Sequence, residues 1–252
     1  MSFSSNVRKY CFEICWAIQG VIVPRLKYSQ QVYEEILRSH VNPDKKWLDL
    51  GCGHKLLPPW RFTQEKELIG QCKMMVGIDY DFHSLKNHKN LSLKIEGDIV
   101  RLPFKDNSFH LITANMVMEH LDNPELQLRE VNRTLKPGGM FILHTPNALG
   151  YTAMAAKCVP SVFKKRLLHF LEGRKEQDTF DIYYKFNTKA RIIRLAKRGG
   201  FQLLNIKMIV SSPRLVMIPP LVIVELIWIR ILMTRAFRPL RTNIIGILKK
   251  IN

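Results

Sequence analysis

From residue 46 onward, short apolar runs alternate along the chain with longer stretches whose apolar residues recur at helical spacing. Strands that are apolar throughout and separated by helices are typical of a parallel sheet with both faces covered. The sequence therefore predicts an α/β fold with a doubly wound, mostly parallel sheet. The expected strands are residues 47–50, 74–78, 91–95, 109–114, 140–144, 201–210 and 242–250.

The ends of two helices between these strands are marked by their residues. Residues 123–125, Asn-Pro-Glu, supply an N-cap, a proline in the first turn and an acid that favours a helix N-terminus. Residues 136–139, Lys-Pro-Gly-Gly, end that helix. Thr188 begins another helix, which residues 199–200, Gly-Gly, end.

The chain has 252 residues, 46% of them hydrophobic, which suffices for one sizeable core with additions. Residues 10–40 carry apolar side chains at helical spacing, divided by Pro24. We therefore expect an N-terminal helical cap over residues 1–45 and one domain over residues 46–252.

The net charge of +18 is concentrated in the C-terminal part of the chain. Residues 151–252 contain 20 Lys and Arg against 5 Asp and Glu, whereas residues 1–150 contain 19 against 16. Such a field attracts phosphorylated molecules, nucleic acid or an anionic membrane surface. The alternative is that the charges serve solubility alone.

Residues 211–238 form an apolar helical insertion before the last expected strand. A helix that starts at residues 219–220, Pro-Pro, would have about 14 residues and a length of about 21 Å, against about 30 Å of membrane hydrocarbon. Glu225 and Arg230 near its middle also argue against a membrane span. Its own domain, a second subunit in a homodimer or the membrane interface would have to cover it. Arginines that suit lipid head groups flank it: Arg214, Arg235, Arg238 and Arg241.

Residues 47–53, Trp-Leu-Asp-Leu-Gly-Cys-Gly, are a buried strand followed by a Gly-x-Gly turn, where backbone can approach a ligand closely. Asp79 ends the second strand, where a carboxylate can accept hydrogen bonds from both hydroxyls of a ribose. A nicotinamide enzyme needs a third glycine for the pyrophosphate, and Leu56 stands at that position. The pattern therefore favours a nucleoside ligand that lacks a pyrophosphate.

Further motifs follow in a fixed order. They are residues 96–109 (Glu-Gly-Asp-Ile-Val-Arg-Leu-Pro-Phe-Lys-Asp-Asn-Ser-Phe), 119–121 (Glu-His-Leu), 135–139 (Leu-Lys-Pro-Gly-Gly) and 145–147 (Thr-Pro-Asn). With these motifs the chain resembles the class I S-adenosylmethionine-dependent methyltransferases, especially the type 11 branch. The resemblance covers about residues 46–147 strongly and 180–250 loosely. It implies a seven-stranded sheet whose last strand, at residues 243–248, is antiparallel.

The resemblance also implies S-adenosyl-L-methionine as the cofactor and no metal. Gly51 and Gly53 would cradle its methionine part, Asp79 the ribose and Asp98 the adenine, while Asn115 would line the site of methyl transfer. The full set of expected cofactor-binding residues is Asp49, Gly51, Cys52, Gly53, Asp79, Tyr80, Asp98, Ile99 and Asn115.

His120 is the candidate catalytic residue, because imidazole can remove a proton from an acceptor hydroxyl near neutral pH. The alternative is that it caps or packs against a loop. Asn147, Tyr183 and Tyr184 are the candidate substrate-binding residues. Asn147 comes just after the fifth expected strand, where ligand crevices open in α/β sheets, and the tyrosines precede the helix that begins at Thr188, where related enzymes place residues that cover the acceptor. For the tyrosines, packing is the competing interpretation.

The acceptor class follows from what the chain lacks. Nucleic-acid amino methyltransferases carry an Asn-Pro-Pro-aromatic loop after the fourth strand, whereas residues 115–118 are Asn-Met-Val-Met. This difference lowers the nucleic-acid option, and we expect O-methylation of a small molecule. The basic, apolar C-terminal region favours a glycan precursor or a lipid-linked compound as that molecule. A cofactor-binding scaffold or regulatory subunit without activity is the alternative. The first residues lack a secretory signal, so the expected location is the cytoplasm, with peripheral attachment to the inner membrane face through residues 211–238 as a further expectation.

Overall fold

The structure is a computed structural model that describes residues 5–158 and 181–251. The chain divides into two compact units. The sheet unit consists of Gln30–Pro146, Ile182–Lys207 and Ile244–Asn252, and the helical unit consists of Met1–Ser29, Asn147–Asp181 and Met208–Asn243. The division therefore falls at Ser29 rather than at the expected boundary after residue 45.

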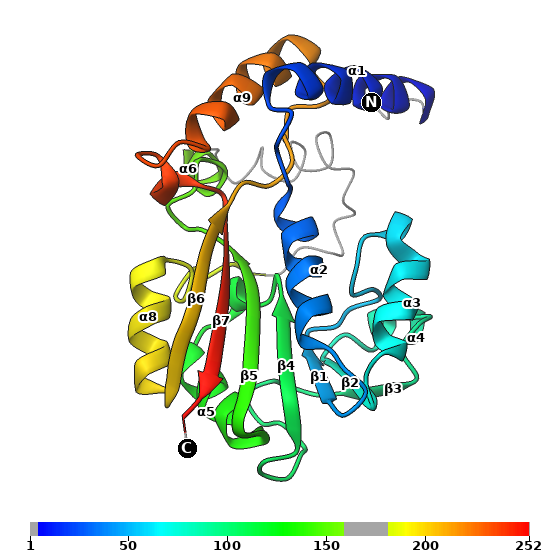
Figure 1. Cartoon of the computed structure of the whole chain (residues 1–252), viewed down its shortest axis with the longest axis vertical. Helices are drawn as coiled ribbons and strands as arrows, with labels where there is room; N and C mark the ends of the chain where they lie inside the picture. The colour runs from blue at the N-terminus through cyan, green and yellow to red at the C-terminus, as the bar shows by residue number, and fades with distance from the viewer. Residues whose placement is uncertain (1–4, 159–180, 252) are drawn as a thin grey trace. The chain divides into compact units, whose positions relative to one another are not determined.

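Seven strands form one sheet in the order β3-β2-β1-β4-β5-β7-β6 (Figure 1). The strands are β1 (Lys46–Leu50), β2 (Met74–Asp79), β3 (Leu93–Glu96), β4 (Phe109–Asn115), β5 (Leu135–Pro146), β6 (Phe201–Ile209) and β7 (Asn243–Lys250). In the parallel register Leu48 of β1 pairs with Val76 on one side and Ile112 on the other. The predicted fold class is confirmed. The chain reverses its direction of travel across the sheet between β1 and β4, and in such sheets ligands bind at the carboxyl ends of the strands.

The last strand, β7, is antiparallel, as the resemblance implied. The backbone N–H of Ile251 donates to the carbonyl of Gly200, just before β6 (3.1 Å). At the other end of the pair, Ser211 N donates to Thr242 Oγ1 (2.6 Å). β6 and β7 therefore run in opposite directions.

Helices flank this sheet (Figure 1), and the expected caps hold two of them. Asn123 accepts a hydrogen bond from Leu126 N at the start of α5, and Thr188 accepts one from Arg191 N at the start of α8. Gly199 follows the last residue of α8. The helices are α2 (Ser29–His40), α3 (Phe62–Gly70), α4 (Phe82–Asn87), α5 (Pro124–Thr134) and α8 (Lys189–Arg198), with short 3-10 turns η1 (Pro59–Arg61) and η2 (Met118–His120).

The helical unit contains α1 (Ser5–Ile22), α6 (Tyr151–Cys158), α9 (Pro219–Leu232) and the 3-10 turn η4 (Arg238–Leu240). α9 starts at the predicted prolines and has 14 residues. Figure 1 shows α1 and α9 side by side, and Cys15 of α1 shares a core with Val222, Leu226 and Ile229 of α9. Within the described ranges, the structure offers no helix long and apolar enough to cross a membrane.

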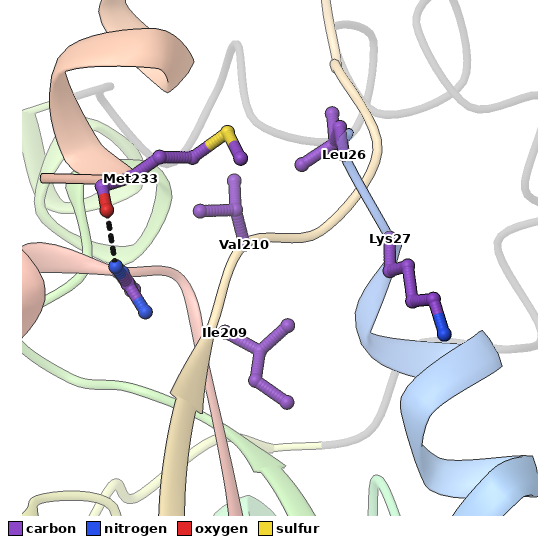
Figure 2. A pocket seen from close by; sticks show the side chains of 6 residues that line it. Leu26, Lys27, Ile209, Val210 and Met233 are labelled. Atoms are coloured by element: carbon purple, nitrogen blue, oxygen red, sulfur yellow. Dashed lines mark hydrogen bonds between the residues drawn. The ribbon is translucent and has the colours of Figure 1, made fainter. Parts of the chain in front are cut away.

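A small pocket of about 120 Å³ lies within the helical unit (Figure 2). It is lined by Leu26, Lys27, Ile209, Val210, Met233 and Arg241. The guanidinium of Arg241 donates to the carbonyls of Leu232, Met208 and Met233. Arg241 therefore ties the end of α9 to the end of β6.

Candidate active site

The turn after β1 has the backbone geometry of a ligand cradle. Gly51 and Gly53 have φ values of +61° and +51°, which side chains disfavour. A Cβ on Gly51 would collide with Val117, whereas one on Gly53 would meet no atom within 4 Å. Gly51 N donates to the carbonyl of Ile78 (2.8 Å), which fixes the turn against β2. The space beside Gly53 is therefore open to a ligand.

Asp79 ends β2 directly beside this turn. Its buried carboxylate accepts one hydrogen bond from Gly53 N (2.8 Å) and one from Asp81 N (2.9 Å). Each carboxylate oxygen can accept two hydrogen bonds, so Asp79 keeps acceptor capacity for ribose hydroxyls. The exposed Tyr80 follows it, and burial, then the charges of Asp79 and Asp81, raises the pKa of its phenol.

The residues expected at the adenine lie at the same edge of the sheet. Gly97 N donates to the carbonyl of Asp79 (3.0 Å), which brings the end of β3 to the ribose position. Asp98 is exposed and accepts a hydrogen bond from Val100 N (2.9 Å), and Ile99 is half-buried. The structure therefore places Asp98 and Ile99 beside Asp79, as a single nucleoside site requires.

Asp49 and Cys52 lie beneath the turn rather than on its open side. Both are buried, and Asp49 accepts a hydrogen bond from Thr113 Oγ1. Burial, with the charges of Glu65 and Asp79 adding to it, raises the pKa of Asp49 to about 7. Burial also raises the pKa of the Cys52 thiol. The arrangement suits support of the turn better than direct contact with a ligand.

Glu65 is a buried acid that the sequence analysis did not single out. One of its oxygens accepts hydrogen bonds from Leu56 N (2.9 Å) and Leu57 N (2.7 Å), and the other accepts one from Asn90 Nδ2 (2.9 Å). It therefore holds the loop that follows Gly53. Glu65 lies in the first turn of α3, where acidic residues are common in any helix. The sequence therefore gives no signal for its role in holding the loop.

Asn115, at the end of β4, is fixed by two residues from other elements. His144 Nδ1 lies 2.8 Å from Asn115 Oδ1. The side-chain amides of Asn115 and of Gln30 in α2 also face each other, and each donates its N–H to the oxygen of the other at 3.4 Å. Complete burial lowers the pKa of His144 to about 3, so its imidazole is neutral and donates through Nδ1. The ring of Tyr33 stacks on His144 at 5.3 Å between centroids. Asn115 is thus held in one orientation at the edge where ligands bind.

His120 lies in η2, just beyond β4, next to a buried carboxylate. Its Nε2 is 3.9 Å from Glu119 Oε1. Glu119 in turn accepts a hydrogen bond from Thr145 Oγ1 (3.1 Å), and Asn187 donates to the same hydroxyl. The half-buried imidazole thus faces a buried acid that the fold holds in place.

The two candidate tyrosines lie beside the backbone of Glu119. The N–H groups of Tyr183 and Tyr184 both donate to the carbonyl of Glu119, at 2.9 and 3.3 Å. Tyr184 has a φ of +52°. The guanidinium of Arg191 donates a hydrogen bond to the carbonyl of Tyr184, which supports this conformation. Tyr183 is exposed, and Lys185 Nζ lies 5.6 Å from its ring centre. The structure therefore brings both tyrosines to the region of His120.

Asn147 has a different role from the one expected. It is completely buried in the helical unit, where its Nδ2 donates to the carbonyls of Pro239 (2.8 Å) and Arg241 (2.7 Å). Its Oδ1 accepts a hydrogen bond from Leu149 N (3.1 Å). Because its polar atoms are engaged with backbone, we leave Asn147 out of the substrate-binding set.

Comparison with known proteins agrees with this geometry. A family model described as a methyltransferase domain matches residues 48–143. Demethylmenaquinone methyltransferase of Staphylococcus haemolyticus is 30% identical over 182 residues, which cover 67% of this chain and 73% of that protein. The enzyme of the same name from Staphylococcus aureus is 30% identical over 175 residues, covering 64% and 69%. The chain belongs to the class I S-adenosylmethionine-dependent methyltransferases.

Solved structures show the same fold at low sequence identity. An S-adenosylmethionine-dependent methyltransferase from Mesorhizobium loti matches with a TM-score of 0.55 at 14% identity, over 88% of this chain and 97% of that one. One from Methanosarcina mazei matches with a TM-score of 0.52 at 16% identity, over 86% and 97%.

The residues present fit the cofactor of this methyltransferase. The open space at Gly53 suits the methionine part, and the remaining acceptor capacity of Asp79 suits the ribose. Asp98, exposed at the end of β3, can accept from an adenine amino group. S-adenosylmethionine supplies an electrophilic methyl group when it is bound. In the part of the chain that the structure describes, no cluster of three side chains suited to holding a metal ion is found.

Proposed function

We propose that this methyltransferase acts on a small, apolar, lipid-linked acceptor that carries a ring hydroxyl, of the quinol type. The relatives from staphylococci, named for demethylmenaquinone, support a quinone-derived acceptor. Of the two acceptor classes expected from the sequence, this supports the lipid-linked compound over the glycan precursor.

The observation that carries the proposal is the pairing of His120 with the buried Glu119. A ring hydroxyl must lose its proton before it becomes a strong nucleophile. His120 Nε2 can take that proton, and Glu119 Oε1 lies 3.9 Å from it. Thr145 holds the carboxylate in turn. The pair therefore supplies a general base where the resemblance places the acceptor.

Positioning does the remaining work, because methyl transfer is an in-line displacement. Asn115, held by His144 and Gln30, lines one side of the proposed acceptor site. Tyr183 and Tyr184 lie at the side of Glu119. During transfer the bond between the methyl carbon and sulfur breaks with its electron pair left on sulfur, and the acceptor supplies the electron pair of the new bond. The methyl group goes either to the hydroxyl oxygen, as the sequence led us to expect, or to the ring carbon that shares its charge.

The test is turnover with a reduced, short-chain quinone that lacks the ring methyl group, measured as formation of S-adenosylhomocysteine. We expect His120→Gln to lower kcat about 100-fold with an unchanged KM for S-adenosylmethionine. NMR of the product locates the methyl group on oxygen or on carbon.

A matched control is His110→Gln, because His110 lies at the start of β4, at the opposite edge of the sheet, where it accepts from Lys46 N. This variant should turn over at nearly the native rate. Equal kcat values for native enzyme and His120→Gln would remove His120 from the mechanism. Failure of the native enzyme to methylate any quinol would overturn the acceptor class.

A further inference from the structure

The face of α9 that points away from the core of the helical unit is apolar. Val222, Leu226 and Ile229 are buried against α1, whereas Val224 and Ile227 on the other side are 63% and 49% exposed. The spacing of three or four residues places the exposed side chains in one stripe along the helix. We call it the outer stripe, and it consists of Ile223, Val224, Ile227 and Ile231.

The neighbouring helix, α1, also exposes large apolar side chains. Its Trp16 is 60% exposed and lies next to Phe12, with 6.0 Å between the ring centres. Tyr10 and Val21 of the same helix are also exposed. Tryptophan and tyrosine are enriched where a protein meets the boundary between lipid and water. The pair of helices thus exposes more apolar surface than a helix pair bathed in water ordinarily does.

Basic residues outnumber acidic ones in the segment that carries the outer stripe. Residues 208–243 contain five arginines and a single acidic residue, Glu225. Glu225 is buried, and it accepts hydrogen bonds from Arg214 N, Leu215 N and the hydroxyl of Tyr151. No carboxylate of α9 therefore offsets the exposed arginines at its end.

This charge pattern decides between the surfaces that could cover the outer stripe. In a two-fold symmetric dimer the exposed Arg230 and Arg235 would approach their own copies, and like charges opposed across an interface cost free energy. An anionic lipid surface offers phosphates to Arg230, Arg235 and Arg238 and an apolar layer to the stripe. The lipid surface is thus the complementary partner.

We propose that α9 docks on an anionic membrane, lying in the plane of the interface with its outer stripe among the upper acyl chains and its arginines on lipid phosphates. A helix of 14 residues is about 21 Å long, which is too short to span the bilayer and suits this orientation. The proposal does not rest on the proposed acceptor, since docking needs no turnover.

The first test measures partition of the full-length protein onto phosphatidylglycerol-containing vesicles and onto neutral phosphatidylcholine vesicles by sedimentation. The double variant Ile227→Gln, Ile231→Gln should partition at least about tenfold less onto the anionic vesicles. The matched control is Leu126→Gln, Ile193→Gln, which replaces equally exposed apolar residues on α5 and α8 and should partition like the native protein.

The second test separates local from overall charge. Arg235→Gln, Arg238→Gln should lower partition onto anionic vesicles about 30-fold, because each basic group near a lipid surface contributes to binding. The control Lys189→Gln, Arg194→Gln removes the same net charge from the exposed side of α8 and should have a much smaller effect. Added salt should narrow the difference between the two variants.

Four outcomes would overturn the proposal. They are an absence of native binding to either vesicle, equal native binding to neutral and anionic vesicles, native-like partition of the Ile227→Gln, Ile231→Gln variant, and a native dimer in solution that this variant dissociates. All the variants should methylate a water-soluble acceptor like the native enzyme. A failure of docking is therefore distinguishable from a failure of the proposed acceptor.

Discussion

The helices α8 and α9 show how differently the two units meet their surroundings. α8, in the sheet unit, buries Ile192 and Leu195 and exposes Arg191 and Arg194 among its outer residues. α9, in the helical unit, buries one apolar face and exposes another, the outer stripe. A helix with a charged outer face is stable in water, whereas one that is apolar all round calls for a further apolar surface. The exposed apolar face of α9 is therefore the difference that the proposed docking on a membrane would explain.

The match to the methyltransferase family model lies in only one of the two units. The matched residues, 48–143, lie entirely within the sheet unit, whose range Gln30–Pro146 encloses them. The outer stripe lies outside that match. The residues that match the family model therefore belong to the sheet unit, and the outer stripe belongs to the helical unit. If so, changes in one unit should leave the function of the other intact.

The largest expected effect is on cofactor binding. Asp79→Asn should weaken the affinity for S-adenosylmethionine by at least about 100-fold, because an amide cannot replace the charged acceptor of two ribose hydroxyls. Isothermal titration calorimetry measures the Kd directly.

The control for this comparison is the variant Ile227→Gln, Ile231→Gln in the helical unit, which should bind the cofactor with the native Kd. An increase in Kd for that variant would show that the helical unit affects cofactor binding in the sheet unit. An unchanged Kd for Asp79→Asn would instead remove Asp79 from the nucleoside site.

The next largest effect concerns the stability of the helical unit. Glu225→Gln leaves the part-buried N–H groups of Arg214 and Leu215, which both donate to this carboxylate, without a charged acceptor. We expect the local free energy of opening of α9 to fall by about 2 kcal/mol, measured by amide hydrogen exchange.

Glu125→Gln serves as the matched acidic control in the sheet unit. Glu125 is exposed and pairs only at the surface with Arg198, so this change should cost less than about 1 kcal/mol. Faster exchange in the strands of the sheet unit after Glu225→Gln would show that the two units unfold together.

The strands and the cofactor end of the site could be predicted because their causes are local. In the buried central strand Trp47–Leu50 every residue except Asp49 is apolar, and a turn at Gly51 and Gly53 needs φ values that only glycine adopts readily. Asp79 is the last residue of β2 and Asp98 follows β3, and the carboxyl ends of these neighbouring strands meet at one edge. Each of these features can be seen within a few residues of sequence.

The rest depends on contacts between distant residues. Asn115 and Gln30 are 85 positions apart, so nothing near either one predicts their pairing. Asn147 looks like a substrate contact at the end of a strand, yet its amide binds carbonyls at Pro239 and Arg241. Glu119 stands beside His120 in the sequence, but only the fold shows that its carboxylate is buried against Thr145.

The smallest expected effect is a pair of opposing pH dependences, both from the centre of the sheet unit. The buried His144 has a pKa of about 3, against an ordinary value of 6.5, so the unfolded chain binds a proton that the folded chain does not. Its contribution to stability is therefore lost as the pH falls below about 6.5. Asp49 has a pKa of about 7, against 3.8, so the folded chain keeps a proton that the unfolded chain has released. Its contribution is lost as the pH rises from about 4 to 7.

Between about pH 5 and pH 7 each group changes the free energy of unfolding by about 2 kcal/mol, in opposite directions. In the native protein the two nearly cancel. His144→Gln should expose the Asp49 trend, with stability falling as the pH rises, and Asp49→Asn should expose the His144 trend, with stability rising. Urea unfolding across this pH range measures both. Parallel pH curves for the native protein and the two variants would show that neither group titrates differently on folding.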